Sequence, residues 1–86
     1  MASIKIPNNV AIIKKRILNR CTSLKSVTIG NSVTSIEFEA FYECTSLTSI
    51  TYSGTIAQYN AINKGVDWKG KVPATVVHCS DGDTPI

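Results

Sequence analysis

The side chains of this chain that are most able to do chemistry are three cysteines and a single histidine, Cys21, Cys44, Cys79 and His78. No Cys-x-x-Cys pair occurs, and His78 stands directly beside Cys79, so the spacing does not suit a zinc site. The odd number of cysteines argues against a closed disulfide framework. We therefore expect three buried, reduced thiols that pack as small apolar groups. A Cys21–Cys44 disulfide is the alternative, because both cysteines begin the same four-residue motif.

Other catalytic patterns receive little support. Asp81-Gly82-Asp83 lacks the further acidic ligands that a calcium site needs. With one histidine and no G-x-S-x-G motif, a serine or cysteine hydrolase is not indicated, and no glycine-rich phosphate loop is present. The sequence predicts that the protein is not an enzyme and has no catalytic residue, no metal and no cofactor.

A basic run could indicate a nucleic-acid or membrane partner, and it consists of Lys14, Lys15, Arg16 and Arg20. A shift of 23 positions places Lys14 on Glu37, Arg16 on Glu39 and Arg20 on Glu43. We expect these opposite charges to lie one above the other on neighbouring coils, with a polyanion site as the alternative. The net charge of +3 is mild. We predict no nucleic-acid partner.

The elements that must position these residues come from an internal repeat. The motif CTSL occurs at Cys21 and again 23 positions later at Cys44. The same offset aligns Ser3 with Ser26 and Ser26 with Ser49. It aligns the first coil with the second, from Ser3 on Ser26 to Cys21 on Cys44, without a gap. A fixed period of 20–50 residues is typical of a solenoid, in which each coil buries its apolar face only by stacking on a neighbour.

Within one period, Leu24, Val27 and Ile29 follow the spacing L-x-x-L-x-L. Val27 and Ile29 should point inward from a short strand, and the alternate residues Ser26 and Thr28 outward. Gly30-Asn31-Ser32 is a turn by composition, and further inward positions follow at Val33, Ile36, Ala40, Phe41 and Cys44. We expect like residues to stack, with Ile6 under Ile29 under Tyr52 and Leu18 under Phe41.

The 23-residue period stops after Thr55. Thr55-Ile56-Ala57-Gln58 fits a capping box, which predicts a helix from Thr55 to about Lys64 with Gly65 as its stop. Trp68 is expected to seal the end of the stack, and residues 74–79 to form a last strand. We predict one domain with a degenerate first coil (1–20), a full repeat (21–43), a half repeat (44–54) and a C-terminal cap (55–86).

The pattern resembles the BspA-type leucine-rich repeats of bacterial surface proteins. The resemblance is carried by CTSLKSVTIGNSVTSIEFEAF and CTSLTSITYSGT, and the tail from Gly54 to Gly82 is similar to the segment that closes such arrays. It implies a mostly β or α/β fold, a short right-handed solenoid with a parallel sheet of short strands, closed by a helix-plus-strand cap. The family usually has glycine where this chain has Lys14 and Glu37, so we expect unusual backbone geometry at both.

The predicted sheet would present outward columns of small polar side chains. The candidate binding face consists of Lys5, Lys25, Ser26, Thr28, Thr48, Ser49 and Thr51, and its columns begin at Ser3. The expected function is a non-catalytic protein-interaction or adhesion module with a protein or glycan partner, belonging to a longer surface protein. The resemblance implies a cell-surface or secreted location. The alternative is a purely structural array terminus or spacer without a ligand.

Two further expectations concern the N-terminal end and the membrane. The coil formed by residues 1–20 has no predicted cover, so we expect Ile4, Ile6 and Ile13 to be only half-buried there. This predicts self-association through this end, with marginal stability of a monomer as the alternative. The N-terminus lacks the order of a signal peptide, and no apolar run approaches the length of a membrane span, so no membrane insertion is expected.

Overall fold

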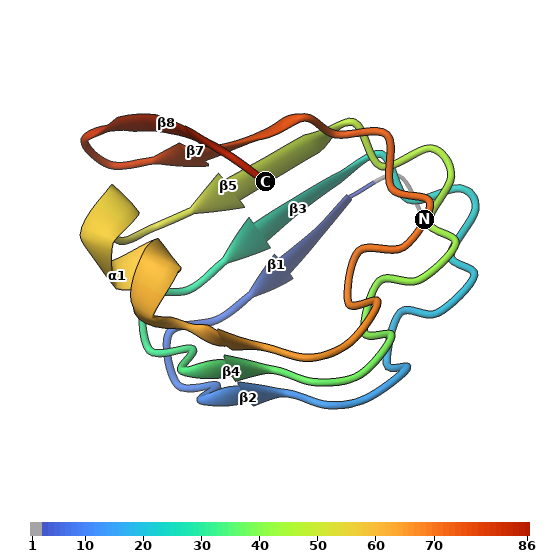
Figure 1. Cartoon of the computed structure of the whole chain (residues 1–86), viewed down its shortest axis with the longest axis horizontal. Helices are drawn as coiled ribbons and strands as arrows, with labels where there is room; N and C mark the ends of the chain where they lie inside the picture. Colours follow the sequence, from blue (N-terminus) through green and yellow to red (C-terminus); the bar gives the residue numbers. More distant parts are fainter. Residues whose placement is uncertain (1–2) are drawn as a thin grey trace.

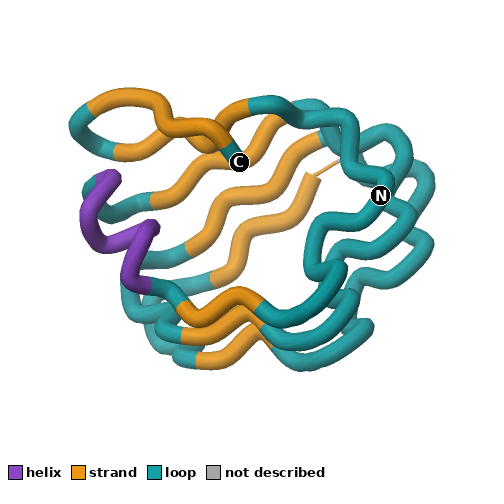
Figure 2. Tube along the Cα trace, viewed as in Figure 1, coloured by secondary structure: helices purple, strands orange, loops and turns teal. Residues whose placement is uncertain are grey.

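The computed structural model describes residues 3–86, and these coil into a solenoid of about three turns (Figures 1 and 2). Within this part of the chain, five strands form one sheet in the order β1 (Ser3–Ile6), β3 (Ser26–Ile29), β5 (Ser49–Tyr52), β7 (Val76–Cys79) and β8 (Gly82–Pro85). Three short strands form a second sheet in the order β2 (Ile12–Ile13), β4 (Ser35–Ile36) and β6 (Asn63–Lys64). Neighbouring strands are parallel, except for the antiparallel pair of β7 and β8.

The strand register confirms the 23-residue period. Ser3 pairs with Ser26 and Ser26 with Ser49, while Ile6 lies beside Ile29 and Ile29 beside Tyr52. Val27 and Ile29 of β3 are 1% and 0% exposed, and the residues between them face outward. The same alternate positions point inward in each coil, and they are fully buried in β3 and β5 and half-buried in β1.

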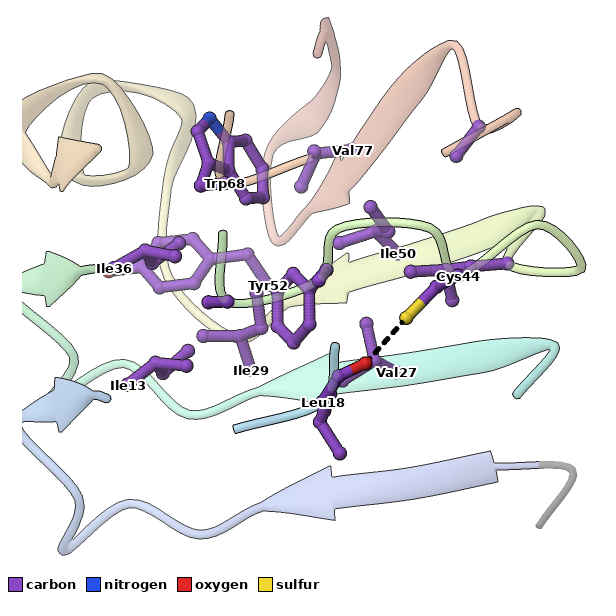
Figure 3. Packing of buried hydrophobic residues seen from close by; sticks show 14 of the residues in the cluster. Ile13, Leu18, Val27, Ile29, Ile36, Cys44, Ile50, Tyr52, Trp68 and Val77 are labelled. Atoms are coloured by element: carbon purple, nitrogen blue, oxygen red, sulfur yellow. Dashed lines mark hydrogen bonds between the residues drawn. The ribbon is translucent and has the colours of Figure 1, made fainter. Parts of the chain in front are cut away.

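Three large side chains from successive coils form one column through the core. Leu18 is 8% exposed, Phe41 is completely buried, and Trp68 is 5% exposed. The rings of Phe41 and Trp68 meet edge to face, with centroids 6.0 Å apart and planes at 64°. Figure 3 shows Leu18 and Trp68 among the buried side chains of successive coils. The expected place of Trp68 at the closed end of the stack is thus seen directly, because its ring covers Phe41.

The turn that follows each strand of the three-stranded sheet has an unusual backbone conformation, which is repeated in every coil. The residues with positive φ in this turn are Arg16, Arg20, Glu39, Glu43, Asp67 and Lys71, with φ between 52° and 67°. Such residues cost about 1–2 kcal/mol each when they are not glycine. Their backbone is held by a ladder of hydrogen bonds between coils, for example from Leu18 N–H to Ala40 O at 2.9 Å and from Phe41 N–H to Trp68 O at 2.8 Å.

This turn corrects the expectation for the two missing glycines. Lys14 and Glu37 do not have positive φ; the strained positions lie two residues later, at Arg16 and Glu39. The Glu37 carboxylate instead accepts a hydrogen bond from the backbone N–H of Lys15 at 3.1 Å.

The helix α1 (Ile56–Ala61) begins as predicted and ends earlier. Thr55 is its N-cap, and both hydrogen bonds of the capping box with Gln58 are present. The predicted end at Lys64 is wrong, since the backbone of Ile62 is already extended, with φ −67° and ψ 132°. Residues 63–64 pair with β4 as strand β6, and this pairing ends the helix.

The last predicted strand forms as β7 and continues into a strand that the sequence did not suggest. Gly82, with φ 137°, begins β8, which turns back along β7 and pairs Val77 with Thr84. Asp81, in the connecting turn, accepts a hydrogen bond from the backbone N–H of Ile56, the first residue of α1, at 2.9 Å. The hairpin and α1 are thus linked at the C-terminal end of the stack.

All three cysteines are free thiols. Only Cys44 is fully buried, whereas Cys21 and Cys79 are half-buried, so the prediction of three buried thiols holds for one. The Cys44 thiol donates to the carbonyl oxygen of Leu18 at 2.9 Å (Figure 3), and burial raises its pKa. This cysteine acts as a packing residue that joins the first and second coils, and its raised pKa makes it a poor nucleophile.

Candidate binding face

The outer face of the five-stranded sheet brings the predicted binding residues into columns. We call this surface the hydroxyl face and define it as Lys5, Lys25, Ser26, Thr28, Thr48, Ser49 and Thr51. Lys5, Thr28 and Thr51 are register partners on β1, β3 and β5, and Ser26 pairs with Ser49. The backbone N–H of Thr48 donates to the carbonyl oxygen of Lys25, which places these two residues side by side at the start of the strands.

The side chains of the hydroxyl face differ in accessibility. Lys5, Lys25 and Thr48 are exposed, and the two serine and two threonine positions on the strands are half-buried. Adjacent strands lie about 4.8 Å apart, so the hydroxyl groups form a regular, shallow array. Each hydroxyl both donates and accepts hydrogen bonds, and the two lysines add positive charge at one edge. This arrangement can bind a partner surface.

Sequence reasoning missed two neighbours of this face. His78 is the register partner of Thr51, and its Nδ1 lies 2.8 Å from a carboxylate oxygen of Asp83. Both side chains are exposed. They were missed because β5 and β7 are offset by 27 residues rather than 23. The outward direction of His78 could have been predicted from the sequence, because side chains alternate along a strand and Val77 is the inward residue beside it.

The basic run is paired as the repeat predicts at two of three positions. Arg16 Nε lies 2.9 Å from Glu39, and Arg20 Nε lies 3.1 Å from Glu43. Lys71 adds a third coil to this column, with its Nζ 3.6 Å from the other oxygen of Glu43. The predicted Lys14–Glu37 pair is wrong, because the Glu37 carboxylate accepts from the backbone of Lys15. Arg16 and Arg20 therefore join neighbouring coils.

Residues 3–86 contain no group of three or more histidine, cysteine, aspartate or glutamate side chains close enough to hold a metal ion. Asp81 accepts from α1, and Asp83 contacts His78, so both acidic residues of the tail have structural partners. Over the same residues, no helix has the length and apolar content needed to cross a membrane.

A family model describes the same coils. The model of the BspA type leucine-rich repeat region, in six copies, matches residues 1–63. The chain belongs to the BspA-type leucine-rich repeat family. No curated protein and no solved structure matches it significantly.

Membership in the BspA-type family agrees with the solenoid and indicates the general kind of function. Its repeats support a repeat protein-interaction module, and leucine-rich repeats are generally non-catalytic. The family match ends at Asn63, before Trp68 and the β7–β8 hairpin. For the closing segment, the resemblance to the ends of other BspA-type arrays remains a prediction.

Proposed function

We propose that this chain is an adhesion module of a surface protein and binds a protein partner through the hydroxyl face. The observation that carries this proposal is the register of the sheet, which aligns Lys5, Thr28 and Thr51 on one accessible surface. The array is shallow and lacks aromatic side chains on which a sugar ring could stack, which disfavours a glycan partner. A cell-surface or secreted location is part of the proposal.

The half-buried hydroxyls favour a partner that follows the pleat of the sheet. Thr28 and Thr51 keep part of their surface in contact with neighbouring strands, so few rotamers are lost when a partner covers them. Lys5 on β1 and Lys25 at the start of β3 lie toward one side of the face, and the His78–Asp83 pair on β7 and β8 lies at the other, which gives the face a charge asymmetry. A partner with acidic groups placed over Lys5 and Lys25 would be oriented by this asymmetry.

The test compares binding to cultured epithelial cells, measured by flow cytometry with biotinylated chain. The variant Thr28→Arg/Thr51→Arg adds two bulky charges to the centre of the hydroxyl face, and we expect binding to fall about ten-fold or more. The matched control is Thr22→Arg/Thr45→Arg, which makes the same change at exposed, equivalent repeat positions outside the face. Treating the cells with protease should remove binding, whereas glycosidase treatment should not.

The alternative function is a structural array terminus with no ligand of its own. Its support is the C-terminal end, where α1 and Trp68 close the stack. Equal, negligible binding by the unmodified chain and both double variants would favour this alternative. Equal loss in both variants would show that charge, rather than the hydroxyl face, decides binding.

A further inference from the structure

The N-terminal end of the solenoid contains an apolar hollow of about 200 Å³. Its lining includes six apolar side chains, Ile4, Ile6, Val10, Ile12, Ile17 and Leu18. Ile12 and Ile17 are 40% and 58% exposed. Phe41 occupies the place of Leu18 one coil later and is completely buried, because the third coil covers it. A contiguous apolar surface of this kind marks a site of association.

Two strand edges border the hollow. Among the described residues, the sheet orders begin at β1 and at β2, so the outer backbone groups of both strands have no strand partner (Figure 1). The other edge of the larger sheet is β8, where Pro85 lacks an N–H and Gly82 has a positive φ. Proline and irregular backbone discourage the addition of a further strand. β1 has neither feature and is the receptive edge.

We propose that this end binds the same end of a second copy of the chain and forms a two-fold symmetric dimer. A partner that pairs with both strands at once must present two strand edges with an apolar surface between them, at the same separation. The same end of a second copy meets this requirement by symmetry, since one two-fold axis pairs β1 with β1 and β2 with β2 in antiparallel fashion. The dimer uses a different surface from the hydroxyl face and does not depend on the function proposed for it.

Charge selects the register of the new strand pair. A pair centred on Lys5 would set Lys5 opposite Lys5 of the second copy, and like charges at this distance are destabilising. A pair centred on Ile4 instead sets Ile4 against Ile4 on the inner side and Lys5 opposite Ser3. Both Ser3 and Lys5 point outward in β1, which makes this register compatible with the pleat.

The same axis also separates the basic turns. The turn after β1, residues 7–11, and the turn after β2, residues 14–20, lie at opposite sides of the coil (Figure 1). The first contains Asn8 and Asn9, and the second contains Arg16 and Arg20. The two-fold rotation exchanges these sides. Each basic turn therefore lies over the asparagine turn of the second copy, and the four arginines of the dimer do not face one another.

The first test is sedimentation velocity of the full chain over a dilution series. We expect a reversible monomer–dimer equilibrium. Ile17→Glu puts a charge into the interface and should weaken the dimer about ten-fold or more. Val66→Glu is the matched control, because Val66 is 70% exposed in the third coil, and it should dimerise as the unmodified chain does. Circular dichroism verifies that both variants are folded.

The second test is disulfide cross-linking, which reports the register. Ser3→Cys and Lys5→Cys are made separately in chains that carry Cys21→Ser and Cys79→Ser, with the buried Cys44 retained. The Ile4-centred register predicts a cross-linked dimer in the mixture of the two variants and little in the Ser3→Cys variant alone. Because Lys5→Cys itself removes the charges that disfavour a Lys5-centred pair, the mixture decides, and the absence of a cross-link there would overturn the register. A monomer at all concentrations, or growth into open-ended oligomers, would overturn the dimer itself.

Discussion

At the C-terminal end of the solenoid, Trp68 covers Phe41 and the α1 residue Tyr59 is 2% exposed, whereas at the N-terminal end Ile17 remains 58% exposed. The coils at the two ends share the same strand pattern. The difference comes from the residues added at one end: an aromatic plug, a capped helix and a hairpin. A coil of this repeat supplies half of a core, and the second half must come from whatever lies against it.

The largest expected effect separates the covered and uncovered coils. Phe41→Ala removes a completely buried ring and should lower the free energy of unfolding by about 3–5 kcal/mol. Leu18→Ala, in the uncovered coil, should cost about 2 kcal/mol, because the hollow beside it is already open to water. Urea unfolding followed by circular dichroism measures both. Equal losses would mean that the two coils are equally well packed.

A second prediction concerns the covered end at alkaline pH. Burial raises the pKa of Tyr59 to about 12, from an ordinary value of 10.0. Because the folded state holds the neutral phenol, this contribution to stability is complete below pH 10 and is lost between about pH 10 and 12. The loss from one such group is steepest at about 1.4 kcal/mol per pH unit. Thermal unfolding across this range measures it.

Tyr59→Phe is the control for the alkaline prediction. The Tyr59 hydroxyl is buried without a hydrogen-bond partner within the part of the chain that the structure describes. Its removal should therefore leave the protein at least as stable at pH 7 and should make the alkaline loss of stability smaller. Burial also raises the pKa of Cys79 and Tyr52, so part of the loss should persist. An unchanged alkaline profile would contradict the role given to Tyr59.

A smaller effect is expected at the start of α1. Thr55→Ala removes the N-cap side chain that accepts from Gln58 N–H and should cost about 1 kcal/mol. Thr55→Ser keeps the hydroxyl and is the matched control. Chemical denaturation distinguishes the two variants. Should alanine and serine be equally tolerated, the bond from Ile56 N–H to Asp81 alone would suffice to begin the helix.

The smallest expected effect lies in the ion pairs between coils. Glu43→Gln removes contacts with Arg20 and Lys71 and should cost less than about 1 kcal/mol, with the difference shrinking as NaCl is added. Glu37→Gln is the control, since its carboxylate accepts from a backbone N–H. A cost for Glu43→Gln that does not depend on salt would show that its side chain acts through packing.

Sequence reasoning predicted those parts of the molecule in which one coil copies another. Register, inward positions and the Arg16–Glu39 and Arg20–Glu43 pairs all follow from the single offset of 23. The early end of the helix and the strand β6 do not follow from that offset. Residues 56–64 have a helical pattern, but residues 63–64 pair with β4 instead, and this tertiary pairing overrides their helix propensity. β8 was missed since Gly82-Asp83-Thr84-Pro85 has low strand propensity, and its pairing to β7 is what makes it a strand. The columns of the hydroxyl face could be predicted from the 23-residue offset. The positions of His78 and Asp83 beside this face could not, because β7 pairs with β5 at an offset of 27 residues and β8 pairs with β7.

The α1 segment also shows how much extra chain the repeat can absorb. The turn residues Glu39 and Asp67 are 28 positions apart, five more than one period, yet the backbone ladder between their coils is intact, with Glu39 N–H donating to Val66 O at 3.1 Å. The additional residues bulge outward as a helix between β5 and β6 and leave both sheets in register. The repeat therefore accepts a longer corner between its two sheets without a change of register in either sheet.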